Sequence, residues 1–292
     1  MINRYHLRYF LSVIDTGNFS RAAGACNVSQ PTLSVGVANL EKSLGAPLFN
    51  RTNRRVALTD AGARLVPYAR TIESAFAAAE REVMGVPVVQ TLRMGVLTTT
   101  PRSWMEGFLR ECQSTAAGGQ VEIVEGKERE LRERLARGRL DVALMTLRDA
   151  DDYAYQRILT EGYRLALAAS HPLAGKDLIR AEDLANDPMI VRRHCELLPD
   201  TSRFFTSRGI RPVFPSRTTS DDKALSYVRS GLGVTIMPDC FSGPGVVRVH
   251  LDGFDFTRDI GLVFAPHVDA AALARSPMIA ALIAAVLPEE QT

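Results

Sequence analysis

Few residues of this 292-residue chain are of the kinds that build metal sites and disulfide scaffolds. The four cysteines and five histidines are scattered, with no C-x-x-C pair and no histidine at the spacing of a zinc ligand. The G-x-S-x-G, H-E-x-x-H and phosphate-binding-loop motifs are absent, and Gly231 and Gly233 lack the third glycine of a dinucleotide loop. We therefore expect no metal, no cofactor and no enzymatic activity.

Long apolar stretches are also missing. No run of about 18 apolar residues occurs, and the N-terminus lacks the apolar core of a signal peptide. The sequence therefore predicts a cytoplasmic protein without a membrane contact. Its apolar content of 46% is enough to fill the cores of two or three domains.

Charge is unevenly distributed along the chain. Residues 1–90 hold 10 Lys and Arg against 6 Asp and Glu, whereas the remainder holds 25 against 27. A basic front on a near-neutral body is typical of a DNA-binding segment attached to a sensing or catalytic body, although a chance excess of solvated arginines gives the same count.

Apolar spacing in the first 45 residues predicts three helices. Leu7, Phe10, Leu11 and Ile14 mark one face of a helix over residues 4–15 that ends near Gly17. Ser20 is the expected cap of a short second helix rich in alanine. The third helix begins after Ser29, has Pro31 in its first turn and ends at Gly45. Its buried stripe consists of Leu33, Val37, Leu40 and Leu44.

The other face of the third helix carries side chains suited to reading base edges. Glutamine pairs with adenine, serine and threonine reach several bases, and an apolar residue packs on a thymine methyl. A Thr-Asn tip follows between two short extended runs and predicts a wing hairpin, whose arginines contact phosphates or the minor groove; a hairpin with solvated arginines is the alternative. The predicted DNA-binding residues are Ser29, Gln30, Pro31, Thr32, Ser34, Val35, Arg51, Arg54 and Arg55.

A long helix follows from Thr59 and Asp60 and ends near Gly85 and Pro87. Its apolar positions alternate by four and three, which is a heptad spacing. This spacing predicts pairing with the same helix of a second chain; packing against its own domain is the alternative. The heptad positions are Leu65, Ala69, Ile72, Phe76, Ala79 and Val83.

Residues 91–292 alternate between apolar runs and amphipathic segments, which predicts a parallel α/β body. Helices are expected over 103–113 and 127–137. The expected strands are 92–97, 121–125, 141–145, 163–169, 189–191, 212–217, 233–237, 246–251 and 261–264. These strands are too many for one small sheet.

Residues 18–62 closely resemble the DNA-binding head of LysR-type transcriptional regulators. F-S-x-A-A, V-S-Q-P-x-L-S, L-E-x-x-L-G-x-x-L-F-x-R and L-T-x-A-G occur at the family's spacing. Further landmarks of the family are G-x-L-D-V-A-L at 138–144, S-H-P-L-A at 170–174 and S-G-L-G-V-T-I-M-P at 230–238. The resemblance thus spans almost the whole chain.

The resemblance implies the domain organisation. An N-terminal, helical winged helix-turn-helix (1–60) and a linker and dimerisation helix with a hinge (61–88) precede an α/β effector domain (89–292). That domain resembles a type 2 periplasmic binding protein, with lobe 1 over 89–161 and 266–292 and lobe 2 over 162–265.

The resemblance also implies the partners. They are double-stranded DNA at an interrupted palindrome, a small-molecule co-inducer between the lobes, and copies of the same chain in a homodimer and homotetramer. RNA polymerase is a further partner that it leaves open.

One departure from the family concerns the reading face. The family usually has a long polar or basic residue, and often glutamine, in the two positions after Ser34, where this chain has Val35 and Gly36. Base readout is therefore expected to depend on the remaining polar residues and the wing, with Val35 on a thymine methyl.

Candidate effector ligands follow the expected strands of the body. Thr98, Thr99 and Thr100 precede a helix, where hydroxyls and free amides bind anions, and the family's cleft contains this loop. A helix cap without a ligand is the alternative. Basic and hydroxyl side chains suited to a carboxylate are further candidates, although the basic ones can equally be solvated. These are Lys127, Arg192, His194, Thr219 and Ser220.

Cys195 supports a second hypothesis about the signal. It lies near the position where the peroxide-sensing branch of the family has a reactive cysteine, but the helix that follows offers no resolving cysteine. An oxidant-sensing regulator is therefore the alternative function. A solute-binding protein fits less well, because it would need an export signal and the first 60 residues would have no role. An enzyme with an α/β body fits less well, because the sequence shows no nucleophile or acid–base pair.

Overall fold

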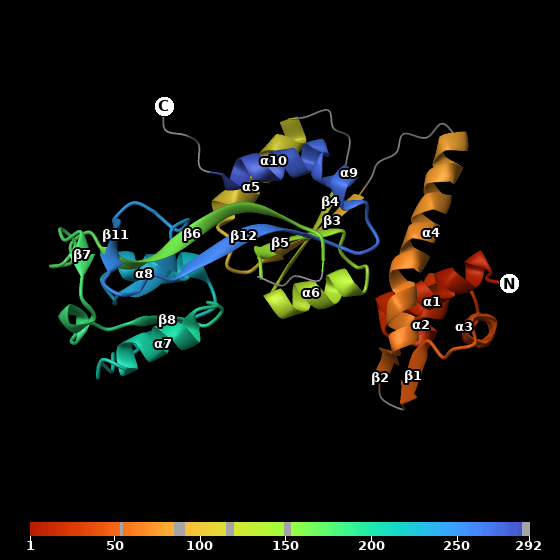
Figure 1. The fold of residues 1–292 in the computed structure, drawn as a ribbon, viewed down its shortest axis with the longest axis horizontal. Helices are drawn as coiled ribbons and strands as arrows, with labels where there is room; N and C mark the ends of the chain where they lie inside the picture. Colours follow the sequence, from red (N-terminus) through yellow and green to blue (C-terminus); the bar gives the residue numbers. More distant parts are fainter. Residues whose placement is uncertain (53–54, 85–90, 115–119, 149–152, 288–292) are drawn as a thin grey trace.

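The computed structural model describes residues 1–52, 55–84, 91–114, 120–148 and 153–287 (Figure 1). A helical head at the N-terminal end is joined to an elongated α/β body. No helix in these ranges is both long and apolar enough to cross a membrane.

Three short helices form the head, and their boundaries follow from local capping. Asn3 caps the first helix, and Gly17, at φ 67°, ends it in the left-handed conformation that favours glycine. The second helix is capped by Asn18 and not by Ser20 as expected, because the Asn18 side chain accepts hydrogen bonds from the amides of Ser20 (2.8 Å) and Arg21 (3.1 Å). The helices are α1 (Arg4–Thr16), α2 (Phe19–Ala25) and α3 (Gln30–Leu44).

The wing is an antiparallel hairpin of β1 (Phe49–Thr52) and β2 (Arg55–Leu58), and it leads into the long helix α4 (Asp60–Met84). The Thr59 hydroxyl fixes this junction, because it donates to the Pro47 carbonyl (2.6 Å) and accepts from the Gly62 amide (3.0 Å). A Cβ atom at Gly62 would lie 2.2 Å from the Leu48 carbonyl oxygen, so the start of α4 packs too closely on the hairpin for any other residue.

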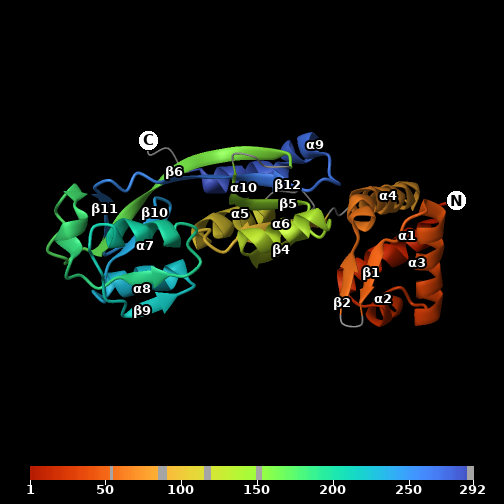
Figure 2. The ribbon, with the colours of Figure 1, turned by 60° about the horizontal axis from the view of Figure 1, so that its bottom comes forward.

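The main sheet of the body is mixed, with the order β4-β3-β5-β12-β6-β11-β7. Its first three strands, β3 (Thr91–Leu97), β4 (Gln120–Gly126) and β5 (Val142–Thr146), are parallel as expected. The rest of the sheet is not parallel, because β12 (Thr257–Phe264) runs antiparallel to both β5 and β6 (Tyr155–Ala168). The chain crosses between the lobes once in each direction, and Figures 1 and 2 show β6 and β12 side by side at the crossing.

Lobe 2 is built on the second half of β6, which pairs with β10 (Thr235–Pro238) and β11 (Val246–Leu251). A strand was expected over 212–217, but only Ser216–Thr218 (β9) pairs, with β8 (Ile190–Arg192). Two prolines in the expected span, at 212 and 215, remove ladder donors and explain the shortening. The remaining elements of this lobe are β7 (Leu178–Ile179), η1 (Ala181–Leu184), α7 (Leu198–Thr206) and α8 (Asp221–Arg229).

Lobe 1 is covered by helices on both faces of its sheet. Trp104 and Phe108 of α5 and Ile279 and Leu282 of α10 are buried in one core with the sheet, whereas Leu131 of α6 belongs to a separate core. These helices are α5 (Arg102–Ser114), α6 (Glu128–Ala136), α9 (Ala270–Ala274) and α10 (Pro277–Val286). Lobe 1 also contacts the head and α4, since Arg139 donates to the Ile14 carbonyl of α1 and the Thr71 hydroxyl of α4 donates to the His267 carbonyl (3.2 Å).

Candidate DNA-binding and effector sites

The N-terminal end of α3 presents the predicted reading residues on the surface. Ser29 caps the helix by accepting from the Thr32 amide (3.2 Å), and the two hydroxyl oxygens lie 2.8 Å apart. The side-chain amide of Gln30 donates a hydrogen bond to the Ser34 hydroxyl (3.2 Å). Ser34 is half-buried, whereas Pro31 and the other members of this group are exposed. A base edge that binds here would therefore replace surface hydrogen bonds, each of which contributes little net free energy to stability. The packing of the head's core would not change.

Val35 and Gly36 have different surroundings. Val35 is 59% exposed and belongs to the reading face. Gly36 is buried against α1, where a Cβ atom would lie 2.6 Å from Cδ2 of Tyr9. The expectation that Gly36 removes a base contact is therefore corrected: a side chain at this position would meet Tyr9 of α1 and not a base, so glycine lets the two helices pack closely.

The wing is anchored to the head by its apolar side chains. Phe49 is buried with its ring 5.3 Å from that of Phe10, and Val56 and Leu58 are half-buried on the same core. Of the predicted wing contacts, Arg54 and the side chains of Arg51 and Arg55 lie outside the described residues.

The heptad stripe of α4 divides into two halves. Ala69 is buried in the core of the head, and Leu65 and Ile72 are half-buried against it. Farther along the helix, Phe76 is 45% exposed and Val83 is 88% exposed. Packing on its own domain thus accounts for the first half of the stripe, and the second half stays open to a partner helix.

A cavity of about 410 Å³ lies between the two lobes. Five of the eight predicted effector residues line it: Thr98, Thr100, His194, Thr219 and Ser220. The loop before α5 supplies the first two from lobe 1, and the other three belong to lobe 2. Sequence reasoning missed several residues that complete the lining, including Arg102, Glu125, Asp222 and Phe241.

Charged groups bridge the two lobes at this cavity. The Arg102 guanidinium of α5 pairs with Asp222 of α8 (2.9 Å), although both side chains are largely exposed. The N-terminal ends of α5 and α8 border the same cavity, and Ser220 caps α8 by accepting from the Lys223 amide (3.3 Å). Helix N-termini carry partial positive charge and favour anions, but Asp222 already supplies one negative group there.

The other three predicted effector residues do not line the cavity. Thr99 is buried and its hydroxyl accepts from Arg258 (3.4 Å). Lys127 is exposed just before α6. Arg192 is buried in lobe 2 and makes two bonds to the Asp221 carboxylate (2.6 and 2.8 Å). Its buried charge requires a counter-ion, and because Asp221 provides one, the guanidinium is occupied.

A buried polar cluster joins the crossing strands to lobe 2. Arg258 of β12 bonds the carboxylates of Glu161 (2.8 Å) and Glu196 (2.7 Å), and the Tyr163 hydroxyl also donates to Glu196 (2.7 Å). Burial alone would raise the pKa of Glu196, but Arg258 and the hydrogen bonds from Tyr163 and the backbone together outweigh burial and keep that pKa below its ordinary value. Burial raises the pKa of Tyr163, so its phenol stays protonated. Sequence spacing gave no signal for this cluster.

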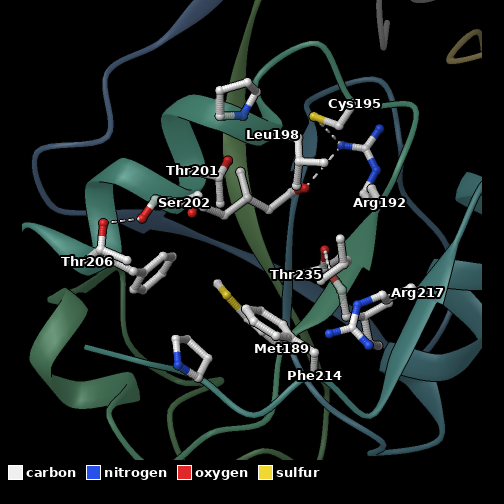
Figure 3. A pocket seen from close by; sticks show the side chains of 16 residues that line it. Met189, Arg192, Cys195, Leu198, Thr201, Ser202, Thr206, Phe214, Arg217 and Thr235 are labelled. Carbon is white, nitrogen blue, oxygen red and sulfur yellow. Dashed lines mark hydrogen bonds between the residues drawn. The ribbon is translucent and has the colours of Figure 1, made fainter. Parts of the chain in front are cut away.

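Cys195 lies between Arg192 and this cluster, half-buried at the start of the segment that leads into α7. Its sulfur accepts a hydrogen bond from Nη1 of Arg192 (3.4 Å), drawn in Figure 3. Burial raises the pKa of the Cys195 thiol, and Arg192 offsets part of that effect. The helix α7 contains no cysteine, and Cys240 accepts instead from Arg258 (3.3 Å).

A winged helix-turn-helix head joined to a two-lobed body with an inter-lobe cavity is the architecture of a DNA-binding regulator. Residues 5–63 match the profile of the bacterial regulatory helix-turn-helix protein of the lysR family, and residues 87–287 match the LysR substrate binding domain. The chain therefore belongs to the family of LysR-type transcriptional regulators, and its DNA-binding function follows.

Comparisons with individual proteins agree with the family. The chain is 33% identical over 268 residues to a probable hydrogen peroxide-inducible genes activator of Mycobacterium avium, covering 88% of this chain and 86% of that protein. It is 28% identical over 278 residues to the DNA-binding transcriptional dual regulator OxyR of Escherichia coli K12, covering 91% and 90%. A full-length OxyR variant from Pseudomonas aeruginosa has the same fold, with a TM-score of 0.69, 23% identity and 98% coverage of both chains.

Proposed function

We propose that the protein binds an interrupted palindrome in promoter DNA as a homodimer, with two heads held by the exposed half of α4, and that two dimers form a tetramer. The exposed apolar side chains of Phe76 and Val83 support this pairing, because an apolar stripe of that length is rarely left in water. RNA polymerase is a further proposed partner, and the cytoplasm is the proposed location. No catalytic role is proposed.

We further propose that a small-molecule co-inducer binds between the lobes and changes the angle between dimers. The observation that carries this proposal is the convergence of Thr98, Thr100, His194 and Ser220 from two lobes on one cavity of about 410 Å³. Hydroxyls, a histidine and two helix N-termini are suited to an anionic group on the ligand, and the carboxylates of Glu125 and Asp222 to a hydrogen-bond donor on the same ligand.

The DNA-binding part is tested by fluorescence anisotropy with DNA from upstream of the neighbouring operon. The affinity should fall steeply with salt, with a log-log slope of about −0.9 for each phosphate neutralised. Gln30→Ala should weaken binding to the preferred site by roughly 1–3 kcal/mol, whereas Asn39→Ala, exposed on the same helix away from its N-terminal end, should not. Equal losses in the two variants would contradict the reading face.

The cavity is tested by filling it. Thr100→Trp should leave the DNA affinity within about twofold of the unmodified protein, because the head is unchanged, but should hold a reporter gene at one level of expression. Thr257→Trp, at an exposed strand end, is the matched control and should respond normally. Normal responses in both variants would place the effector elsewhere.

Oxidant sensing through Cys195 is the second candidate. The observation in its favour is that relatives of up to 33% identity are described as hydrogen peroxide-inducible genes activators, combined with the hydrogen bond from Arg192 to the Cys195 sulfur. That bond stabilises a thiolate, the form that attacks a peroxide.

Titration with hydrogen peroxide separates the two candidates. An oxidant sensor should change its DNA footprint in proportion to peroxide, and Cys195→Ser should abolish that change while Cys112→Ser preserves it. A peroxide response that survives in Cys195→Ser rules this candidate out.

A further inference from the structure

Lobe 2 contains a second cavity, of about 350 Å³, which shares no lining residue with the one between the lobes. Its walls are α7, β8, β10 and the segment at 212–217 (Figure 3). Neither the family assignment nor the proposed co-inducer site gives this cavity a role.

The surface of this cavity is mainly apolar. Ile190 and Phe205 are buried on it, and Phe214 is a partly exposed ring at its edge. Two of its polar side chains are already satisfied within the chain: the Thr235 hydroxyl donates to the Ile190 carbonyl (2.8 Å), and the Thr206 hydroxyl donates to the Ser202 carbonyl (2.8 Å). The site therefore offers contact surface rather than a network of polar groups.

The size of the cavity selects a class of ligand. An apolar cavity of about 150 Å³ holds one benzene ring, so about twice that volume suits two fused rings. A helix of a partner protein is about 10 Å across and would not enter a space of this volume. A small aromatic molecule fits better than a macromolecule.

One cation at the edge of the cavity indicates that the ligand carries a negative charge. Two arginines line the cavity, but Arg192 is neutralised by Asp221. Arg217 is exposed, with its guanidinium 5.5 Å from the centre of the Phe214 ring, and no carboxylate pairs with it in the described ranges. Figure 3 shows Arg217 across the cavity from the α7 hydroxyls. A free guanidinium beside an aromatic ring is suited to a carboxylate on an aromatic ligand.

We propose that this cavity is a second ligand site, for a bicyclic aromatic carboxylate whose rings lie on Phe205 and Phe214 and whose carboxylate bonds Arg217. Because Cys195 also lines the cavity, the ligand covers one side of its thiol. Binding would thus join α7 to the segment at 212–217 and shield Cys195 from solvent. The proposal does not depend on Cys195 being a sensor.

The probe is 2-naphthoate, added to the reduced full-length protein. Saturable binding is measured by calorimetry, and the position of the probe by the rate at which iodoacetamide alkylates each cysteine, read by mass spectrometry. At saturation the alkylation of Cys195 should slow by about fivefold or more, because its thiol is covered, while Cys26 in the head and Cys112 in lobe 1 keep their rates.

Two substitutions separate the contributions of charge and volume. Arg217→Gln should weaken 2-naphthoate by about tenfold and leave the neutral 2-naphthalenemethanol unchanged, whereas the exposed neighbour Arg211→Gln should affect neither. Thr201→Phe, which fills the cavity, should abolish the binding of both compounds.

Three results would overturn the proposal. One is the absence of saturable binding to protein that melts cooperatively, and another is an affinity in Arg217→Gln equal to that of the unmodified chain. The third is binding that is lost in Thr100→Trp, whose side chain fills only the other cavity, which would place the probe between the lobes. Because Arg217 is exposed, its variant is expected to fold even if Thr201→Phe does not.

Discussion

The buried ion pair of Arg192 and Asp221 allows a sharp test of what holds lobe 2 together. The two side chains are only 2% and 8% exposed, and both guanidinium bonds are shorter than 2.9 Å. Asp221→Asn keeps the shape of the side chain but leaves Arg192 as a buried charge without a counter-ion. Removing one partner of such a pair typically costs about 3–5 kcal/mol.

This cost converts into a measurable melting shift. For a domain of the size of residues 87–287, each 1 kcal/mol lowers the melting temperature by about 2–4 °C, so a loss on the order of 10 °C is expected. Calorimetry of the full-length protein records the transition of the body. The adjacent Asp222→Asn removes an exposed pair, worth about 0–1 kcal/mol, and should lower that transition by at most a few degrees.

A double variant identifies the cause. If the loss comes from the unpaired charge, Arg192→Met combined with Asp221→Leu should recover most of the stability, because apolar replacements of both partners remove the desolvation cost. The reasoning is refuted if Asp221→Asn and Asp222→Asn lower the transition equally, or if the double variant is less stable than Asp221→Asn alone.

Three further predictions concern other parts of the chain. Gly36→Ala should destabilise the head by about 1–3 kcal/mol, because its Cβ meets Tyr9 of α1 and this clash outweighs the helix propensity of alanine, which favours the variant by about 1 kcal/mol. Chemical denaturation measures the difference, and a variant as stable as the unmodified protein would contradict the prediction. Val35→Arg should change the base preferred under this exposed position, and an unchanged consensus from selected DNA sequences would refute the assigned reading face. Burial opposes ionisation of Asp141, but hydrogen bonds from His267 and Arg93 lower its pKa to about 2. The ionised carboxylate therefore contributes roughly 2 kcal/mol to the free energy of unfolding above pH 4, and this contribution is lost as the pH falls toward 2. Asp141→Asn should lack that loss when stability is measured against pH.

Local signals explain why the head was predicted well. Ser29, Pro31 and Gly45 act within one helical turn of the boundaries they set, so α3 begins and ends at the expected residues. The exceptions required knowledge of geometry. Asn18 caps α2 because its side chain reaches two amides, and a sequence containing both Asn18 and Ser20 does not show which of them does so.

The body was predicted less completely because its decisive contacts are distant in sequence. Apolar runs located most strands but not their direction, which is set by the return of β12 beside β6 about 100 residues later. Thr99 and Arg192 did not reach the inter-lobe cavity for the same reason, because each is held by a residue distant in sequence. By residue type, Arg192 is suited to binding an anion. Only its contact with Asp221, 29 residues away, shows that it is part of the buried core of lobe 2.

The Arg192–Asp221 pair also has a position that connects the two cavities. Arg192 lines the cavity within lobe 2, and Asp221 lines the cavity between the lobes, where it begins α8 beside Ser220. The pair therefore forms part of the wall between them. Because its two charges are buried, neither side chain can move far without leaving the other uncompensated, at a cost of several kcal/mol.

Coupling between the cavities follows from this shared wall and can be measured. A ligand that moved α8 at the inter-lobe cavity would also move Asp221. Arg192 would have to follow, because its buried charge needs that carboxylate, and its Nη1 donates a hydrogen bond to the Cys195 sulfur. The alkylation rate of Cys195 is thus a remote reporter of the inter-lobe cavity. Thr100→Trp, which fills that cavity from lobe 1, should change this rate without touching Cys195, and the change should disappear when Arg192→Met and Asp221→Leu replace the pair. If Thr100→Trp changed the alkylation rate of Cys195 equally with and without the Arg192–Asp221 pair, the pair would not couple the two cavities.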